Sequence, residues 1–97
     1  MRRIERRLMR LNDEVARLRR RIELTDGELN MHRHLADDAI RDAAVTAGPI
    51  ERAEARDANK DVARLEGAAA AARRDLARAE AKRKGLLDRL GEPSGPT

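Results

Sequence analysis

Apolar residues recur every three or four positions along two long stretches of the chain. In the first stretch the steps alternate between four and three residues, and no proline interrupts them. Its seam positions are Ile4, Leu8, Leu11, Val15, Leu18, Ile22, Thr25, Leu29, His32, Ala36, Ala39 and Ala43. The second stretch steps in the same way through Ala55, Ala58, Val62, Leu65, Ala69, Ala72, Leu76, Ala79, Arg83, Leu86 and Leu90. This spacing predicts two long helices, each with one narrow apolar seam.

The two seams are separated by Gly48-Pro49. Glycine suits the left-handed residue that ends a helix, and proline suits the first position of the next helix. If the chain folds back here, facing seam residues have numbers that sum to about 97 or 98, and every layer is filled. Leu18 then faces Ala79. The sequence therefore predicts an all-α fold, a two-helix antiparallel coiled-coil hairpin that is open to self-association into a helical bundle.

The predicted hairpin spans residues 1–90, with helix 1 over about 2–46 and helix 2 over about 50–90. Residues 91–97 contain two glycines and two prolines and predict a flexible tail. The segment Thr25-Asp26-Gly27-Glu28 also matches a capping box, so a kink in helix 1 at 25–27 stays open. Near the turn the seam is almost all alanine and buries little area, which makes this the weaker end.

Composition supports a thin core. The chain has no Phe, Trp or Tyr, and 41% of its residues are charged, so the large side chains that fill globular cores are missing. It has no cysteine, which excludes disulfides and thiolate metal sites. No apolar run is long enough to span a bilayer, and no apolar stretch follows the basic N-terminal residues. A cytoplasmic location is therefore expected.

Charge divides the chain into unlike ends. Residues 1–21 hold nine arginines against three acidic residues, and residues 73–97 hold seven basic against four acidic residues. Folding brings these segments together with a net charge of +9. Residues 22–47 and 48–72 have net charges of −4 and −1, which give −5 at the turn end. The predicted rod is basic at its open end and acidic toward its turn.

The basic end has two interpretations. It is either a solvated surface with opposite charges spaced for pairing along each helix, or a binding site for a polyanion. A polyanion would be nucleic acid phosphate or an acidic protein surface, and binding would be electrostatic because no aromatic side chains can stack on bases. The candidate residues are Arg2, Arg3, Arg6, Arg7, Arg10, Arg17, Arg20, Arg21, Arg74, Arg78, Lys82 and Lys84, with Arg19, Arg73 and Arg83 beside them.

A second apolar set lies off the seam. Leu24 and Met31 are seven residues apart on helix 1, and Leu35 extends their line by one turn. On the facing helix, Ala68 and Ala71 offer a surface of small residues. Scattered apolar residues on a surface need no special explanation. The alternative is a protein-binding face, used for self-association or for a partner helix.

Candidate chemistry is sparse. His32 and His34 are two residues apart and point in different directions on a helix, so they do not form a metal-binding pair. A cluster of acidic residues near the turn (Asp37, Asp38 and Asp42) is more simply a solvated face than a Mg²⁺ site. The sequence has no glycine-rich phosphate loop and no nucleophile with a base at a recognisable spacing. We therefore expect no enzyme activity, and no catalytic, cofactor-binding or metal-binding residues.

Two families share features with the chain. Residues 40–67, which include Ala55-Arg56-Asp57-Ala58 and Arg64-Leu65-Glu66-Gly67, loosely resemble the helical arm of Gre-type transcript cleavage factors. Gly48-Pro49 stands where that family has its acidic catalytic loop, so the cleavage activity is not carried over. The length and central turn also resemble small helical-hairpin substrates of type VII secretion. Thr46-Ala47-Gly48 replaces their Trp-x-Gly turn, and the aromatic export signal is missing.

The sequence favours a non-enzymatic interaction protein, an adaptor or assembly element that binds a protein partner or itself. Its contact residues would be Leu24, Met31, Leu35, Ala68 and Ala71, and the basic end would add electrostatic attraction. The alternative is a small basic regulator that binds nucleic acid, or a nucleic-acid enzyme such as RNA polymerase, through its arginines. We expect no membrane span and no small-molecule substrate in either case.

Overall fold

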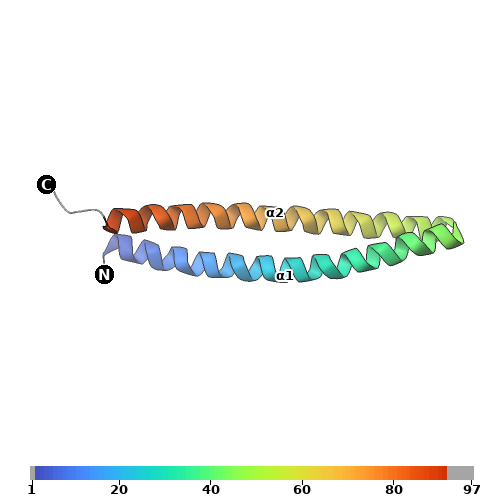
Figure 1. Cartoon of the computed structure of the whole chain (residues 1–97), viewed down its shortest axis with the longest axis horizontal. Helices are drawn as coiled ribbons and strands as arrows, with labels where there is room; N and C mark the ends of the chain where they lie inside the picture. The colour runs from blue at the N-terminus through green and yellow to red at the C-terminus, as the bar shows by residue number, and fades with distance from the viewer. Residues whose placement is uncertain (1, 92–97) are drawn as a thin grey trace.

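Two long helices fold back on each other to form one rod (Figure 1). The computed structural model describes residues 2–91, in which α1 spans Arg3–Thr46 and α2 spans Pro49–Gly91. At 1.5 Å per residue, the 44 residues of α1 are about 66 Å long. The helices run antiparallel, so the ends of the described chain lie together, opposite the turn. The predicted all-α helical hairpin is confirmed.

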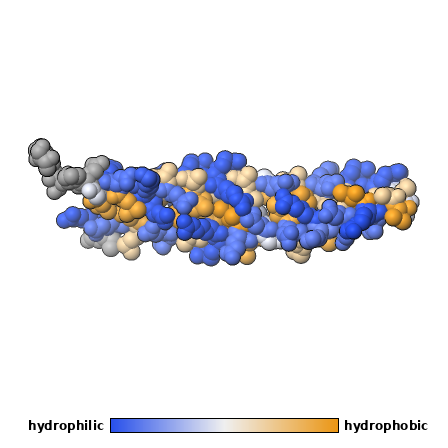
Figure 2. Space-filling model, viewed as in Figure 1, coloured by the Kyte–Doolittle hydropathy of each residue, from blue (hydrophilic) through white to orange (hydrophobic). Residues whose placement is uncertain are grey.

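The core of the rod is the seam between the helices. Buried residues on α1 are Val15, Leu18, Leu29 and Ala36, and those on α2 are Ala55, Leu65, Ala69, Ala72, Ala79 and Leu86. All of them occupy predicted seam positions, and the other seam residues are half-buried with one exception. Figure 2 shows hydrophobic residues along the line where the helices meet and hydrophilic residues along the outer edges.

Leu90 is the exception, because 46% of its surface is exposed. Leu90 lies one residue before Gly91, the last residue of α2, whereas Leu86, one turn earlier, is buried.

The best-packed part of the seam lies in the basic half of the rod. Val15 is 1% exposed and forms a buried cluster with Leu18 and Ala79, against which Leu76 packs. Large side chains from α1 meet a small one from α2 here, which lets the two helices interdigitate. The predicted contact between Leu18 and Ala79 is confirmed.

Three ion pairs join the helices along one flank of the seam. The N–O distances are 3.1 Å for Arg19–Glu80, 2.6 Å for Arg73–Asp26 and 3.5 Å for Arg33–Glu66. Successive pairs are seven residues apart on each helix, with the sign of the charge alternating along each helix. In every pair the residue numbers sum to 99, so a single register holds along this length.

The turn differs from the predicted geometry at one residue. Ala47, and not Gly48, adopts the left-handed conformation, with φ 54° and ψ 26°. Its N–H donates to the carbonyl oxygen of Ala43 at 2.8 Å, which closes the last turn of α1. The end of the Glu51 side chain lies close to Gly48. Pro49 is the first residue of α2, as predicted.

Two further boundaries were uncertain in the sequence. The segment 25–27 lies inside a continuous α1, so helix 1 does not restart there. Thr25 is half-buried on the seam, whereas Gly27 is exposed with open space around its Cα. Gly91 was predicted to open the tail, but it is the last residue of α2. Residues 92–97 of the predicted tail lie outside the described residues.

Candidate interaction surface

The two flanks of the seam are not alike. With seam residues at heptad positions a and d, the three interhelical ion pairs use position e on both helices. We call this side the bridged flank. Positions g and c lie on the opposite side of the seam on both helices. We call that side the open flank, because no interhelical ion pair joins its residues in the described part of the chain.

The predicted protein-binding residues all lie on the open flank. Leu24, Met31 and Leu35 occupy positions c, c and g of α1, and their exposed fractions are 69%, 55% and 53%. Ala68 and Ala71 occupy positions g and c of α2 at the same level of the rod; Ala68 is exposed and Ala71 is half-buried. The fold thus brings these five residues to one side, where they form what we call the apolar patch.

Other large apolar side chains are also exposed. The predicted contact residues do not include Met9, Ile50 or Leu87, whose exposed fractions are 54%, 68% and 52%. The sequence could have identified them as exposed, because each is a large apolar residue outside the heptad spacing of the seam. Met9 and Leu87 occupy positions b and e, on the bridged flank, whereas Ile50 and Val45, which is 86% exposed, occupy position c beside the turn, at the acidic end of the open flank. They are therefore separate from the apolar patch.

Two adjoining hollows mark the open flank in the basic half of the rod. The first has a volume of about 450 Å³ and the second about 340 Å³, and Arg17 lines both. The first is lined by Arg7, Arg10, Leu11, Asp13, Glu14, Arg17 and Lys82. The second is lined by Arg17, Arg20, Arg21, Leu24, Thr25 and Glu28, so it leads from the arginines to the apolar patch.

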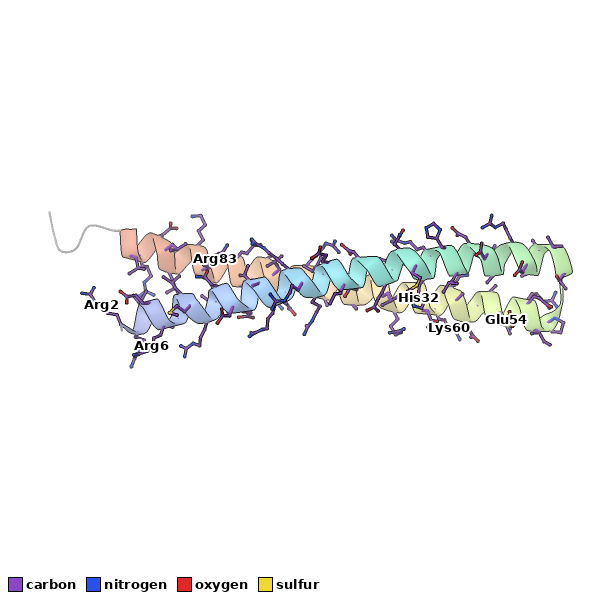
Figure 3. All side chains as sticks on the ribbon, turned by 90° about the horizontal axis from the view of Figure 1, so that it is seen from below. Arg2, Arg6, His32, Glu54, Lys60 and Arg83 are labelled. Carbon is purple, nitrogen blue, oxygen red and sulfur yellow. The ribbon has the colours of Figure 1, made fainter. Side chains whose placement is uncertain are left out.

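The predicted polyanion-binding residues are all exposed. Figure 3 shows Arg2 and Arg6 on α1 and Arg83 on α2 at the same end of the rod. Some candidates are already paired along their own helix, since Arg78 binds Asp75 and Lys84 binds Asp88 at 2.9 Å. These contacts reduce the positive charge that α2 offers to a ligand.

Three other basic residues serve the hairpin itself. Arg19 and Arg73, which the sequence grouped with the basic end, form interhelical ion pairs on the bridged flank. Arg83 is half-buried at its seam position, and its Nη1 donates to Oδ1 of Asn12 at 3.5 Å. Sequence composition did not separate these residues from their neighbours, because the distinction depends on the register of the two helices.

The remaining candidate chemistry is dispersed. His32 is half-buried on the seam and His34 is exposed. In the acidic cluster near the turn, Asp38 binds Arg41 at 2.6 Å. Among residues 2–91, no group of three or more His, Cys, Asp or Glu side chains is placed to hold a metal ion. Neither α1 nor α2 contains a stretch long and apolar enough to cross a membrane.

No protein family model, curated protein or solved structure matches the chain.

Proposed function

We propose that the chain is a non-enzymatic coiled-coil interaction protein, an adaptor or assembly element that binds through its open flank. The observation that carries this proposal is the apolar patch, in which three large side chains of α1, each more than half exposed, lie beside small residues of α2. A helix from a partner would bury these side chains against the hairpin and gain about 25 cal/mol for each Å² of apolar surface removed from water. The cytoplasmic location expected from the sequence is part of this proposal.

The basic hollows support a contribution from charge. Arg7, Arg10 and Arg17 lie on the same flank as the patch, and none of them has an ion-pair partner in the described residues. Arginines beside an apolar contact raise the rate of association and favour partners of opposite charge. A partner that covers the patch would meet these side chains at one edge.

The test is a comparison of capture by three tagged forms of the chain in cells that express it. Leu24→Asp with Met31→Asp places two charges in the patch. Met9→Asp is the matched control, because Met9 is as exposed as Met31 but lies on the bridged flank. The wild type and the control should retain the same bound proteins, measured by quantitative mass spectrometry, and the double variant should lose them. Equal capture by all three forms would exclude the patch as the binding surface.

The second candidate function is binding of nucleic acid, or of a nucleic-acid enzyme, through the basic end. The two arginine-lined hollows favour it. Such binding would neutralise phosphates and would weaken steeply as salt is added. Titration of a fluorescent DNA or RNA duplex at low ionic strength tests it, with Arg17→Glu and Arg21→Glu in one chain as the weakened variant. Absence of binding by the wild-type chain at low salt would reject this function.

A further inference from the structure

Charge is distributed unevenly around the rod as well as along it. In the basic half (residues 2–21 and 73–91), positions g and c hold eight basic and two acidic residues, a net charge of +6. In the turn half (residues 22–72), the same positions hold one basic and six acidic residues, a net charge of −5. All other positions hold eight basic and four acidic residues in the basic half, and five of each in the turn half. The other positions of the turn half are neutral in sum, so its whole net negative charge lies on the open flank.

Along the open flank, a basic segment is therefore followed by the apolar patch and then by an acidic segment that extends to the turn. A surface with this order is complementary to itself when a second copy is turned end for end. Twofold symmetry requires this kind of self-complementary patch, because the same surface serves both partners. In a parallel arrangement the +6 segments would face each other, and juxtaposed like charges oppose association.

The complementarity extends to individual positions of α1. A twofold axis perpendicular to the rod, beside residues 29 and 30, places each g or c residue i opposite residue 59 − i of the second copy. Leu24 then faces Leu35, and Arg21 faces Asp38. Position c of one copy meets position g of the other in each case. The facing residues are Arg17 with Asp42, Arg21 with Asp38, Leu24 with Leu35, Glu28 with Met31, and Glu14 with Val45; the last two pairs set a carboxylate against an apolar side chain.

The same operation matches α2 with itself. With the axis beside residues 69 and 70, each g or c residue i lies opposite residue 139 − i of the second copy. The two alanines of the apolar patch then face each other across the axis, which permits close approach of the backbones. The facing residues are Ala68 with Ala71, Asp61 with Arg78, Asp57 with Lys82, and Arg64 with Asp75. Within each copy, Arg78 also binds Asp75, and Arg64 binds Asp61 at 3.8 Å.

One axis satisfies both helices. The ion pairs Asp26–Arg73 and Arg33–Glu66 tie α1 to α2 on either side of the proposed axis. The level midway between them lies beside residues 29 and 30 of α1 and beside residues 69 and 70 of α2. The residue pairs of α1 and those of α2 therefore place the axis at the same level of the rod.

We propose that two copies of the chain associate antiparallel through their open flanks, forming a twofold four-helix bundle with the apolar patch at its centre. This inference rests on the proposed function and names its partner as a second copy. Four helices enclose a thicker core than two, and the exposed leucines and methionine become part of it. The basic hollows of each copy receive the acidic turn half of the other.

Mass measurement gives the first test. Sedimentation equilibrium of the wild-type chain and of Met9→Asp should give twice the 10.9 kDa of one chain. Leu24→Asp with Met31→Asp should dissociate at least tenfold more readily, while circular dichroism shows that its helices remain. A monomer at all concentrations for the wild type would overturn the inference.

Cysteine crosslinking tests the antiparallel register, since the natural chain has no cysteine. Leu24→Cys and Leu35→Cys chains, mixed and oxidised, should form a mixed disulfide and few self-linked dimers. Because residue 24 of one copy lies opposite residue 35 of the other, the two copies of residue 24 would be 11 residues, or about 16 Å, apart along α1. A disulfide requires Cα atoms within roughly 7 Å of each other. Preferential self-linking at residue 24 would indicate a parallel dimer and overturn the proposal.

A charge exchange tests the ends of the interface. Arg17→Asp or Asp42→Arg alone should weaken association severalfold, because each places like charges opposite one another. Both changes in one chain should restore it, since residues 17 and 42 face each other twice in the bundle. If the double variant is weaker than either single variant, the two residues are not opposed and the proposed register is wrong.

The inference and the proposed function fail separately. If the wild-type chain is monomeric but the patch variant loses captured proteins, the open flank binds a different partner and only the inference fails. If the patch variant changes neither mass nor capture, both fail. Salt-sensitive binding of a nucleic acid duplex by a monomeric chain would also overturn the inference and favour the second candidate function.

Discussion

The two halves of the hairpin are held together by side chains of different size. In the basic half, Val15, Leu18 and Leu86 are buried in the seam, and each has a branched side chain. In the turn half, Leu29 and Leu65 are buried toward the centre of the rod, whereas the buried residues nearer the turn, Ala36 and Ala55, carry only a methyl group. Small side chains let the helices approach closely, but they remove little apolar surface from water. The free energy of the helix contact is therefore concentrated in the basic half and the centre of the rod.

The turn half has a compensating advantage. Its helices are joined by a two-residue connection, so their pairing there costs little loop-closure entropy. In the basic half the paired residues are far apart in sequence, and large apolar contacts must offset that cost. The difference between the halves indicates why the larger side chains lie far from the turn.

The largest expected effect comes from truncating the seam in the basic half. Leu18→Ala removes a side chain that is 7% exposed and packs in the cluster around Val15. The free energy of unfolding should fall by about 2 to 4 kcal/mol. Ala36→Gly, the corresponding truncation in the turn half, should cost roughly 1 to 2 kcal/mol, through helix propensity and one buried methyl group. Urea unfolding at one fixed protein concentration measures both values.

Met9→Ala provides the reference for this comparison. Met9 lies in the basic half but is 54% exposed, so its truncation should change the free energy of unfolding by no more than about 0.5 kcal/mol. If Ala36→Gly destabilises the hairpin as much as Leu18→Ala does, the two halves contribute equally and the comparison is wrong.

A smaller effect of opposite sign is expected at the turn. Ala47 is the non-glycine residue with positive φ in the described chain, and its Cβ disfavours this conformation by about 1 to 2 kcal/mol. Ala47→Gly should therefore raise the free energy of unfolding, by about 0.5 to 1 kcal/mol once the greater freedom of glycine in the unfolded chain is included. Thermal unfolding followed by circular dichroism checks the sign.

The matched control is Ala44→Gly, the same chemical change three residues earlier in α1. Ala44 is exposed and has helical geometry, so glycine there should destabilise the hairpin by about 1 kcal/mol. Equal effects of the two substitutions would mean that the strain at Ala47 does not limit the stability of the turn half.

The seam spacing and Gly48-Pro49 were enough to predict the hairpin, because two independent heptad patterns fitted a single fold-back. The local details were not predictable in the same way. Glycine is the usual left-handed residue, yet Ala47 takes that conformation, and Gly48 lies between it and Pro49, the first residue of α2. Gly91 remains helical although its residue type favours a helix end.

The candidate site was predictable in part. Leu24, Met31 and Leu35 stand out in the sequence because they are large apolar residues outside the seam. Their position beside Ala68 and Ala71, on the flank without interhelical ion pairs, depends on the register of α1 against α2. The same register decides which basic residues form ion pairs between the helices, and composition alone could not identify them.

The smallest expected effect concerns the ion pairs, and it sharpens the comparison of the halves. Arg19–Glu80 lies in the basic half and Arg33–Glu66 in the turn half, and all four side chains are at least 40% exposed. Exposed pairs contribute about 0.2 to 1 kcal/mol wherever they lie, because water and salt screen them. Double-mutant cycles with alanine should therefore give similar small coupling energies for the two pairs, both reduced by 0.5 M salt (roughly a 4 Å screening length). A coupling energy at either pair as large as the effect of Leu18→Ala would show that surface charge, and not the size of the seam side chains, distinguishes the two halves.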